Sequence, residues 1–144
     1  MTDDPALDPL NPYHARVLRF INSNGEPSDE LSADNAHRLL INLGEDDGIE
    51  ASERVIIFAL GEEINDLDTG EALGKFEVVR GEGRVESVQA KMAIVKSSRK
   101  TNHQRRKAMG ALFAAASGAQ PEYETVTVDA PFRQPQIGDF VRFI

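Results

Sequence analysis

Seven cations gather between Ser87 and Pro121, a stretch that contains no Asp or Glu. Lys and Arg side chains at this density can bind nucleic-acid phosphates, an anionic membrane surface or the carboxylates of a protein. The whole chain of 144 residues has a formal net charge of −8, so the remainder carries −15 (−8 minus 7). This segregation predicts an electrostatic binding arm. The cations are Lys91, Lys96, Arg99, Lys100, Arg105, Arg106 and Lys107.

The second half of the same stretch is small and apolar, with the sequence AMGALFAAASGA. In a helix, Met109, Leu112 and Phe113 would share one face, because they are spaced at i, i+3 and i+4. Gly110 would cost that helix about 1 kcal/mol relative to Ala, and cations at its N-terminus oppose the helix dipole. We therefore expect a marginal helix that orders against a partner or against the rest of the chain.

The preferred ligand of this arm is a protein partner or a second copy of the chain. Nucleic acid, bound through residues 91–107, is the weaker alternative, because Phe113 is the only aromatic available for stacking and the acidic remainder repels a polyanion. Two other interpretations of the arm remain open: a short amphipathic segment that binds a membrane surface, and a plain solvated loop between two strands. The predicted contact residues are Arg99, Lys100, Arg105, Arg106, Lys107, Met109, Leu112 and Phe113.

Residues suited to catalysis are sparse. The chain has no Cys, and its three histidines, His14, His37 and His103, are scattered, so neither a thiol nucleophile nor a metal cluster is indicated. No G-x-S-x-G elbow occurs. The segment Gly81-Glu82-Gly83 lacks the third glycine of a dinucleotide loop. We expect no enzymatic activity, no cofactor and no metal.

Length and composition predict one small domain with an attached arm. The N-terminus carries neither a basic region nor an apolar core of a secretory signal, and no apolar run approaches the roughly 18 residues that span a bilayer. We expect a soluble, cytoplasmic protein without an integral membrane segment.

The first third of the chain predicts a disordered terminus over residues 1–11 and a helical lid over residues 12–48. A helix from Pro12 to Ile21 would begin with Asn11 as its N-cap, although a strand from Ala15 to Ile21 is nearly as well supported. A second helix would follow Ser32 and end at Gly44. Its apolar positions are Ala36, Leu39, Leu40 and Leu43. A lid is preferred over a helix-turn-helix, since the second helix offers few cations for DNA.

Residues 49–144 alternate as short strands separated by turn residues, which predicts a small SH3-like or OB-like antiparallel barrel. Turns are expected at Asp66–Gly70 and at Gly81–Gly83. Residues 97–121 form a basic insertion. The expected strands are Arg54–Leu60, Glu71–Arg80, Arg84–Gln89, Met92–Lys96, Tyr123–Asp129 and Phe140–Ile144.

The turn D-x-x-T-G-E-x-L-G, the following hairpin and the closing G-D-x-V strand resemble the C-terminal domain of the flagellar assembly protein FlgT, a bacterial family. The resemblance implies an SH3-like barrel over about residues 50–144, and only the fold is carried over. The predicted small barrel, the sparse catalytic residues and the basic arm together favour a non-enzymatic protein-interaction or assembly module. The matching residues are Asp66, Thr69, Gly70, Glu71, Leu73, Gly74, Val85, Val88, Ala93, Gly138, Asp139 and Val141.

Overall fold

The computed structural model describes residues 15–106, 118 and 123–144, and these residues form a mainly β structure. They fall into two compact units, Met1–Arg99 with Pro131–Ile144, and Lys100–Ala130. The predicted disordered terminus, residues 1–11, lies outside the described residues.

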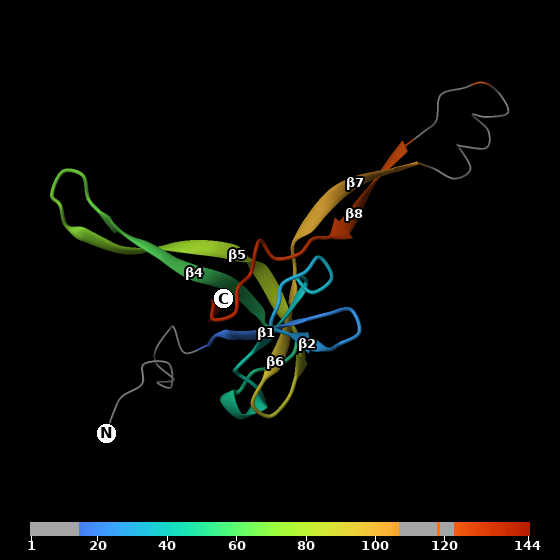
Figure 1. Cartoon of the computed structure of the whole chain (residues 1–144), viewed down its shortest axis with the longest axis horizontal. Coiled ribbons are helices and arrows are strands. Elements are labelled where there is room, and N and C mark those ends of the chain that lie inside the picture. Colours follow the sequence, from blue (N-terminus) through green and yellow to red (C-terminus); the bar gives the residue numbers. More distant parts are fainter. Residues whose placement is uncertain (1–14, 107–117, 119–122) are drawn as a thin grey trace. The chain divides into compact units, whose positions relative to one another are not determined.

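The first unit is built on one seven-stranded antiparallel sheet with the order β2-β1-β3-β6-β5-β4-β9 (Figure 1). Its described strands do not form a closed barrel, which corrects the predicted architecture. One isolated bridge, between Arg16 and Phe140, joins the chain before β1 to the far edge strand. The strands are β1 (Val17–Ile21), β2 (Pro27–Ser28), β3 (Arg38–Ile41), β4 (Arg54–Asn65), β5 (Ala72–Val88), β6 (Ala93–Ser97) and β9 (Phe140–Phe143).

The helical lid is not formed by the described residues. Val17–Ile21 is a strand, as the alternative to the first helix predicted. The second predicted helix is wrong, because residues 38–41 pair with β1 on one side and with β6 on the other. Within this strand Leu39 and Ile41 are both fully buried, which is the alternation of a sheet and not a helical period. The one helix among the described residues is a 3-10 turn, Glu45–Asp47.

Two glycine assignments also change. Gly44 does not end a helix; a Cβ at this position would lie 2.3 Å from the carbonyl oxygen of Gln89. Gly81–Gly83 is not a turn, because β5 runs unbroken through it for 17 residues. A Cβ on Gly83 would lie 2.7 Å from Val95 Cγ1 and 2.9 Å from Phe132 Cζ. These glycines allow close packing of neighbouring segments.

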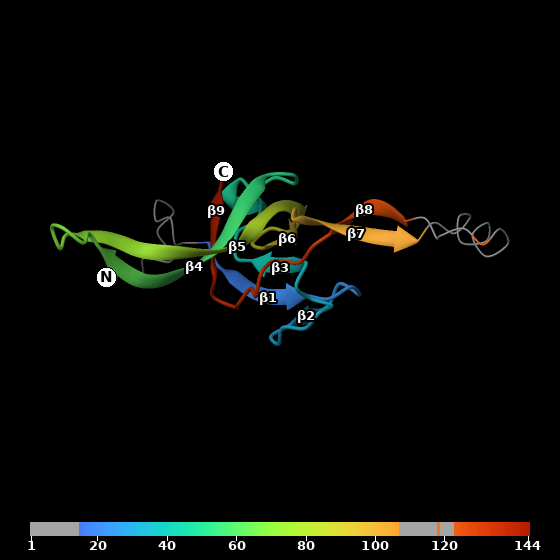
Figure 2. The same cartoon turned by 90° about the horizontal axis from the view of Figure 1, so that it is seen from above.

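The pairing of β4 with β5 continues well beyond the strands that flank it. β9 pairs with β4 only from Val55 to Phe58, and β6 pairs with β5 only from Gly83 to Val88. The register between β4 and β5 nevertheless extends to Asn65↔Ala72. Figures 1 and 2 show this hairpin running away from the other strands of its sheet.

The hairpin closes in the predicted turn at Asp66. Its side-chain carboxylate accepts hydrogen bonds from the backbone N–H groups of Asp68 and Thr69, at 2.8 and 3.0 Å. These bonds favour the ionised form and lower the pKa of Asp66. Gly70 completes the turn in the left-handed region, with φ of 74°.

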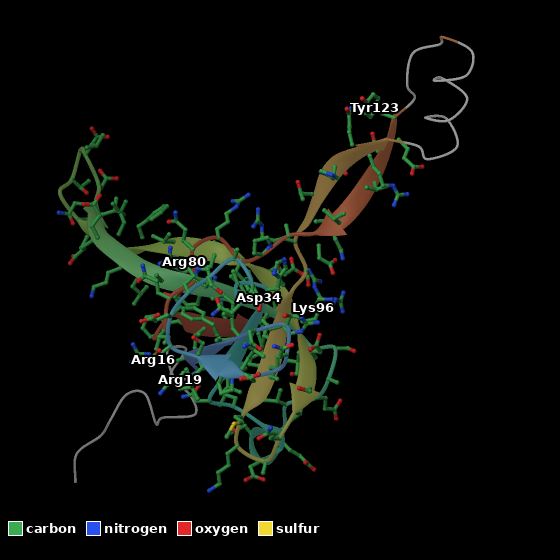
Figure 3. The ribbon with its side chains drawn as sticks, turned by 45° about the vertical axis from the view of Figure 1, so that its right-hand side comes forward. Arg16, Arg19, Asp34, Arg80, Lys96 and Tyr123 are labelled. Atoms are coloured by element: carbon green, nitrogen blue, oxygen red, sulfur yellow. The ribbon has the colours of Figure 1, made fainter. Side chains whose placement is uncertain are left out.

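A buried ion pair joins β5 to the segment that leads into β9. Arg80 Nε lies 3.1 Å from Asp139 Oδ2, and the side chains are 13% and 5% exposed. The same carboxylate oxygen accepts a hydrogen bond from the backbone N–H of Gln136 at 2.8 Å. Figure 3 shows Arg80 on the sheet of the first unit. The carboxylate is therefore paired and hydrogen-bonded, as burial of a charge requires.

We predict that Asp139→Ala lowers the free energy of unfolding by about 3–5 kcal/mol, because it leaves the Arg80 guanidinium buried without its partner. Urea unfolding measures the change. The matched control is the double variant Arg80→Met/Asp139→Leu, which removes both charges and should recover much of the loss. An unchanged urea midpoint for the single variant would contradict the structural role of the pair.

Candidate functional site

Four of the eight predicted contact residues belong to the described part of the chain. Lys100, Arg105 and Arg106 lie on β7 (Lys100–Arg106), in the second unit, whereas Arg99 lies in the first. The other four lie outside the described residues: Lys107, Met109, Leu112 and Phe113.

Arg99 has a structural role within the first unit. Its guanidinium donates a hydrogen bond to the carbonyl oxygen of Pro131. Its aliphatic stem passes over Gly81, where an added Cβ would lie 2.9 Å from Arg99 Cδ. This side chain is already committed to holding two segments of the first unit together.

The second unit is a two-stranded antiparallel hairpin of β7 with β8 (Tyr123–Asp129). Its register places Lys100 opposite Asp129 and Arg105 opposite Glu124, and both couples form ion pairs. Arg105 Nε lies 2.9 Å from Glu124 Oε1. The sequence did predict the strand Tyr123–Asp129, but not that its carboxylates pair with Lys100 and Arg105. Opposite-charge couples at directly opposed positions stabilise such a hairpin.

These pairs weaken the nucleic-acid alternative. A phosphate would have to compete with Asp129 for Lys100 and with Glu124 for Arg105. Each of these exposed ion pairs contributes only about 0–1 kcal/mol, so a phosphate can displace the carboxylate. Breaking the pair nevertheless reduces the binding free energy gained from each phosphate contact. Binding of nucleic acid through residues 91–107 remains a prediction without added support.

A second surface, which sequence reasoning missed, lies on the protruding hairpin of β4 and β5. The register sets Ala59 opposite Val78 and Ile64 opposite Gly74. A Cβ on Gly61 would lie 3.5 Å from Val78 Cγ2 and 3.9 Å from Phe76 Cβ. Gly74, Phe76 and Val78 alternate along β5 and so share one face, and the register shift between Leu60 and Glu63 brings Ile64 to the same side as Ala59 and Gly61. We call this side the apolar hairpin face: Ala59, Gly61, Ile64, Gly74, Phe76 and Val78.

The apolar hairpin face is open to solvent. Phe76 is 59% exposed, Ile64 37% and Val78 36%. Leu67 and Leu73, close to the turn, are exposed as well. A contiguous group of large apolar side chains in this state is typical of an interaction surface, whereas single exposed apolar residues are ordinary.

The hairpin that carries this face is acidic. Residues 61–78 contain six carboxylates and one Lys, a formal charge of −5 (1 minus 6). On the opposite side of the hairpin, Glu63 faces Lys75. Glu77 receives two hydrogen bonds from Arg142, at 2.9 and 2.8 Å. The carboxylates of residues 61–78 are Glu62, Glu63, Asp66, Asp68, Glu71 and Glu77.

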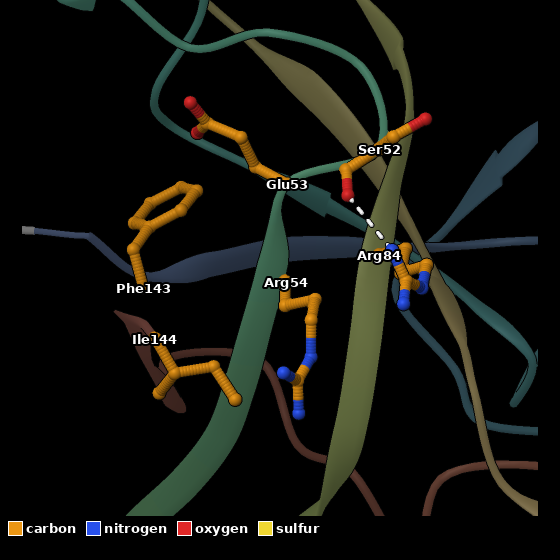
Figure 4. Close-up of a pocket in the computed structure, with 6 residues that line it drawn as sticks. All are labelled: Ser52, Glu53, Arg54, Arg84, Phe143 and Ile144. Atoms are coloured by element: carbon orange, nitrogen blue, oxygen red, sulfur yellow. Dashed lines mark hydrogen bonds between the residues drawn. The ribbon is translucent and has the colours of Figure 1, made fainter.

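A pocket of about 380 Å³ lies at the other end of the β4–β5 pair (Figure 4). Arg84 donates to the carbonyl oxygen of Ser52 at 3.2 Å, and Arg54 donates to Glu82 at 2.7 Å. The lining residues include a serine but no histidine, so they supply no nucleophile–base pair of the Ser–His kind. They are Ser52, Glu53, Arg54, Arg84, Phe143 and Ile144.

The described residues offer neither a metal site nor a membrane-spanning helix. No group of three or more His, Asp or Glu side chains there is placed to hold a metal ion. Within the same residues, no helix has both the length and the apolar character needed to cross a bilayer.

Comparison with known proteins adds no relative. No protein-family model, no curated protein and no solved structure matches this chain.

The Glu77–Arg142 pair predicts a pH dependence. The hydrogen bonds from Arg142 lower the pKa of Glu77. Its contribution to stability is therefore present above the pKa of the unfolded chain and is lost as the pH falls through the lower, folded pKa. Glu77→Gln should reduce the free energy of unfolding at neutral pH by less than about 1 kcal/mol, because the pair is partly exposed.

Urea unfolding of the wild type and Glu77→Gln between neutral and acid pH measures this effect. The difference between the two proteins should shrink as the pH falls below the normal range of a glutamate. Glu62→Gln, which removes the same charge from an exposed position of the same hairpin, is the control. A difference that is constant across the pH range would refute the assignment.

Proposed function

We propose that this chain is a non-enzymatic protein-interaction or assembly module that binds its partner through the apolar hairpin face. The observation that supports this proposal is the exposure of Ile64, Phe76 and Val78 on a hairpin that extends beyond its sheet. The proposal keeps the class of function that the sequence predicts but moves the principal surface from the basic arm to the β4–β5 hairpin.

Energetics favour a partner for this face. A two-stranded hairpin alone is marginally stable in water, and its stability rises when one face is covered. Full burial of a Val, Ile or Phe side chain contributes about 1.5–3 kcal/mol relative to its exposure. Aromatic side chains in particular provide a large contact area at a small entropic cost, and they are enriched in interfaces. Phe76 is the natural anchor of such an interface.

The proposal extends to the fold. We propose an SH3-like arrangement of the strands, related to the C-terminal domain of FlgT. Its support is the order β1-β3-β6-β5-β4-β9 together with the bridge between Arg16 and Phe140 at the two ends of that order. Asp139 and Val141 of the closing G-D-x-V segment are both buried, as a structural motif requires.

A photo-crosslinking amino acid tests the proposal directly. We expect p-benzoylphenylalanine in place of Phe76, in the full chain in its native cells, to form a discrete adduct with a protein upon irradiation. Adding Ile64→Asp should reduce the yield several-fold, because it places a charge on the same apolar face. The control carries the crosslinker at the exposed Ser87, on the part of β5 that pairs with β6. Equal yields at both positions, or no adduct at position 76, would reject this surface.

A further inference from the structure

Resting on the proposed function, we infer that the partner is a second copy of this chain, which docks its basic and apolar segment, residues 104–117, on the apolar hairpin face. The two surfaces differ within one chain, so each contact joins the hairpin of one copy to the segment of another, and we propose that the contacts repeat head-to-tail. The structure supplies the receiving surface, and the sequence of the segment supplies its chemistry.

The charges of the hairpin and of the segment 104–117 are complementary, which favours this segment as the occupant of the hairpin face. The receiving hairpin, residues 61–78, carries a formal charge of −5 (1 minus 6). The segment QRRKAMGALFAAAS carries +3 from Arg105, Arg106 and Lys107, and it contains no acidic residue. Symmetric contact between two copies of the hairpin would set −5 against −5, which like-charge repulsion opposes. A head-to-tail contact places opposite charges together instead.

The apolar parts of the two surfaces match as well. After its three cations, the segment continues with Met109, Leu112 and Phe113 among small residues. The hairpin presents Phe76 and Val78 next to Gly61, which has no side chain to keep a partner away. Aromatic and Met side chains packed against such a face, with charges at the rim, are typical of protein interfaces. Arg105 can change partner at low cost, because its ion pair with Glu124 is exposed.

The symmetry of this contact has a consequence for assembly. In a head-to-tail dimer, one hairpin and one basic segment remain unused, so further copies can add until a ring closes or a filament forms. The association should also weaken with salt, because ionic screening acts on exposed rim charges.

Sedimentation velocity of the purified full chain tests the inference. The wild type should increase in mass with concentration, and more so at low salt. The hairpin variant Glu62→Lys/Glu63→Lys and the segment variant Arg106→Glu/Lys107→Glu should each weaken self-association at least about tenfold. The control variant Asp29→Lys/Glu30→Lys makes the same charge change as the hairpin variant, but in an exposed loop, and it should behave as the wild type. Circular dichroism confirms that each variant is folded.

Mixing the two charge variants gives the decisive comparison. The segment of the hairpin variant is unchanged, and so is the hairpin of the segment variant, so an equimolar mixture should restore association that neither protein shows alone. A mixture that remains monomeric would overturn the inference. A wild type that is monomeric at every concentration would also overturn the inference. This includes the case in which the segment contacts the hairpin of its own chain. A monomeric wild type that still crosslinks to a different protein through position 76 would leave the proposed function intact and reject only the second copy.

Discussion

The pairing of β4 with β5 is the interaction on which the rest of this structure depends. Near the flanking strands the pair contributes to the core, because Val55, Ile57 and Val85 are buried in the hydrophobic cluster of the first unit. Farther along, the same two strands continue with only each other as partners among the described residues. One continuous hydrogen-bonded ladder therefore serves first as scaffold and then as an exposed surface.

Local patterns predicted several of the strands. Arg54–Leu60 and Tyr123–Asp129 follow from β-branched runs and alternation, and both are strands. The segment around Leu39 was misjudged because four apolar positions there fit a helical period as well as a strand. Its pairing with β6, more than 50 residues away, decided the outcome. Gly81–Gly83 was misjudged because a glycine required by close packing has the same local pattern as a glycine required by a turn.

The candidate site was only half visible in the sequence. The basic run was evident. The ion pairs of Lys100 and Arg105 depend on the register of β7 with β8, which brings together residues separated by 29 and 19 positions in the chain. The apolar hairpin face was hidden for the opposite reason. Alternating Phe76 and Val78 are typical of a strand with a buried face, and their exposure follows from where β6 and β9 stop pairing. Sequence periodicity identifies a face but not what covers it.

The acidic surroundings of the apolar face explain how a protein can keep such a hairpin exposed. Unpaired strand edges and apolar faces invite association with any similar surface, and natural proteins limit this with charges. Here the hairpin that presents Phe76 and Val78 carries six carboxylates and one Lys over residues 61–78, so two hairpins repel each other, whereas a cationic segment is attracted. The charges that oppose pairing of two hairpins are therefore also the charges that the proposed cationic segment would meet. In the proposed contact, the charges would supply selectivity and the apolar side chains would supply affinity.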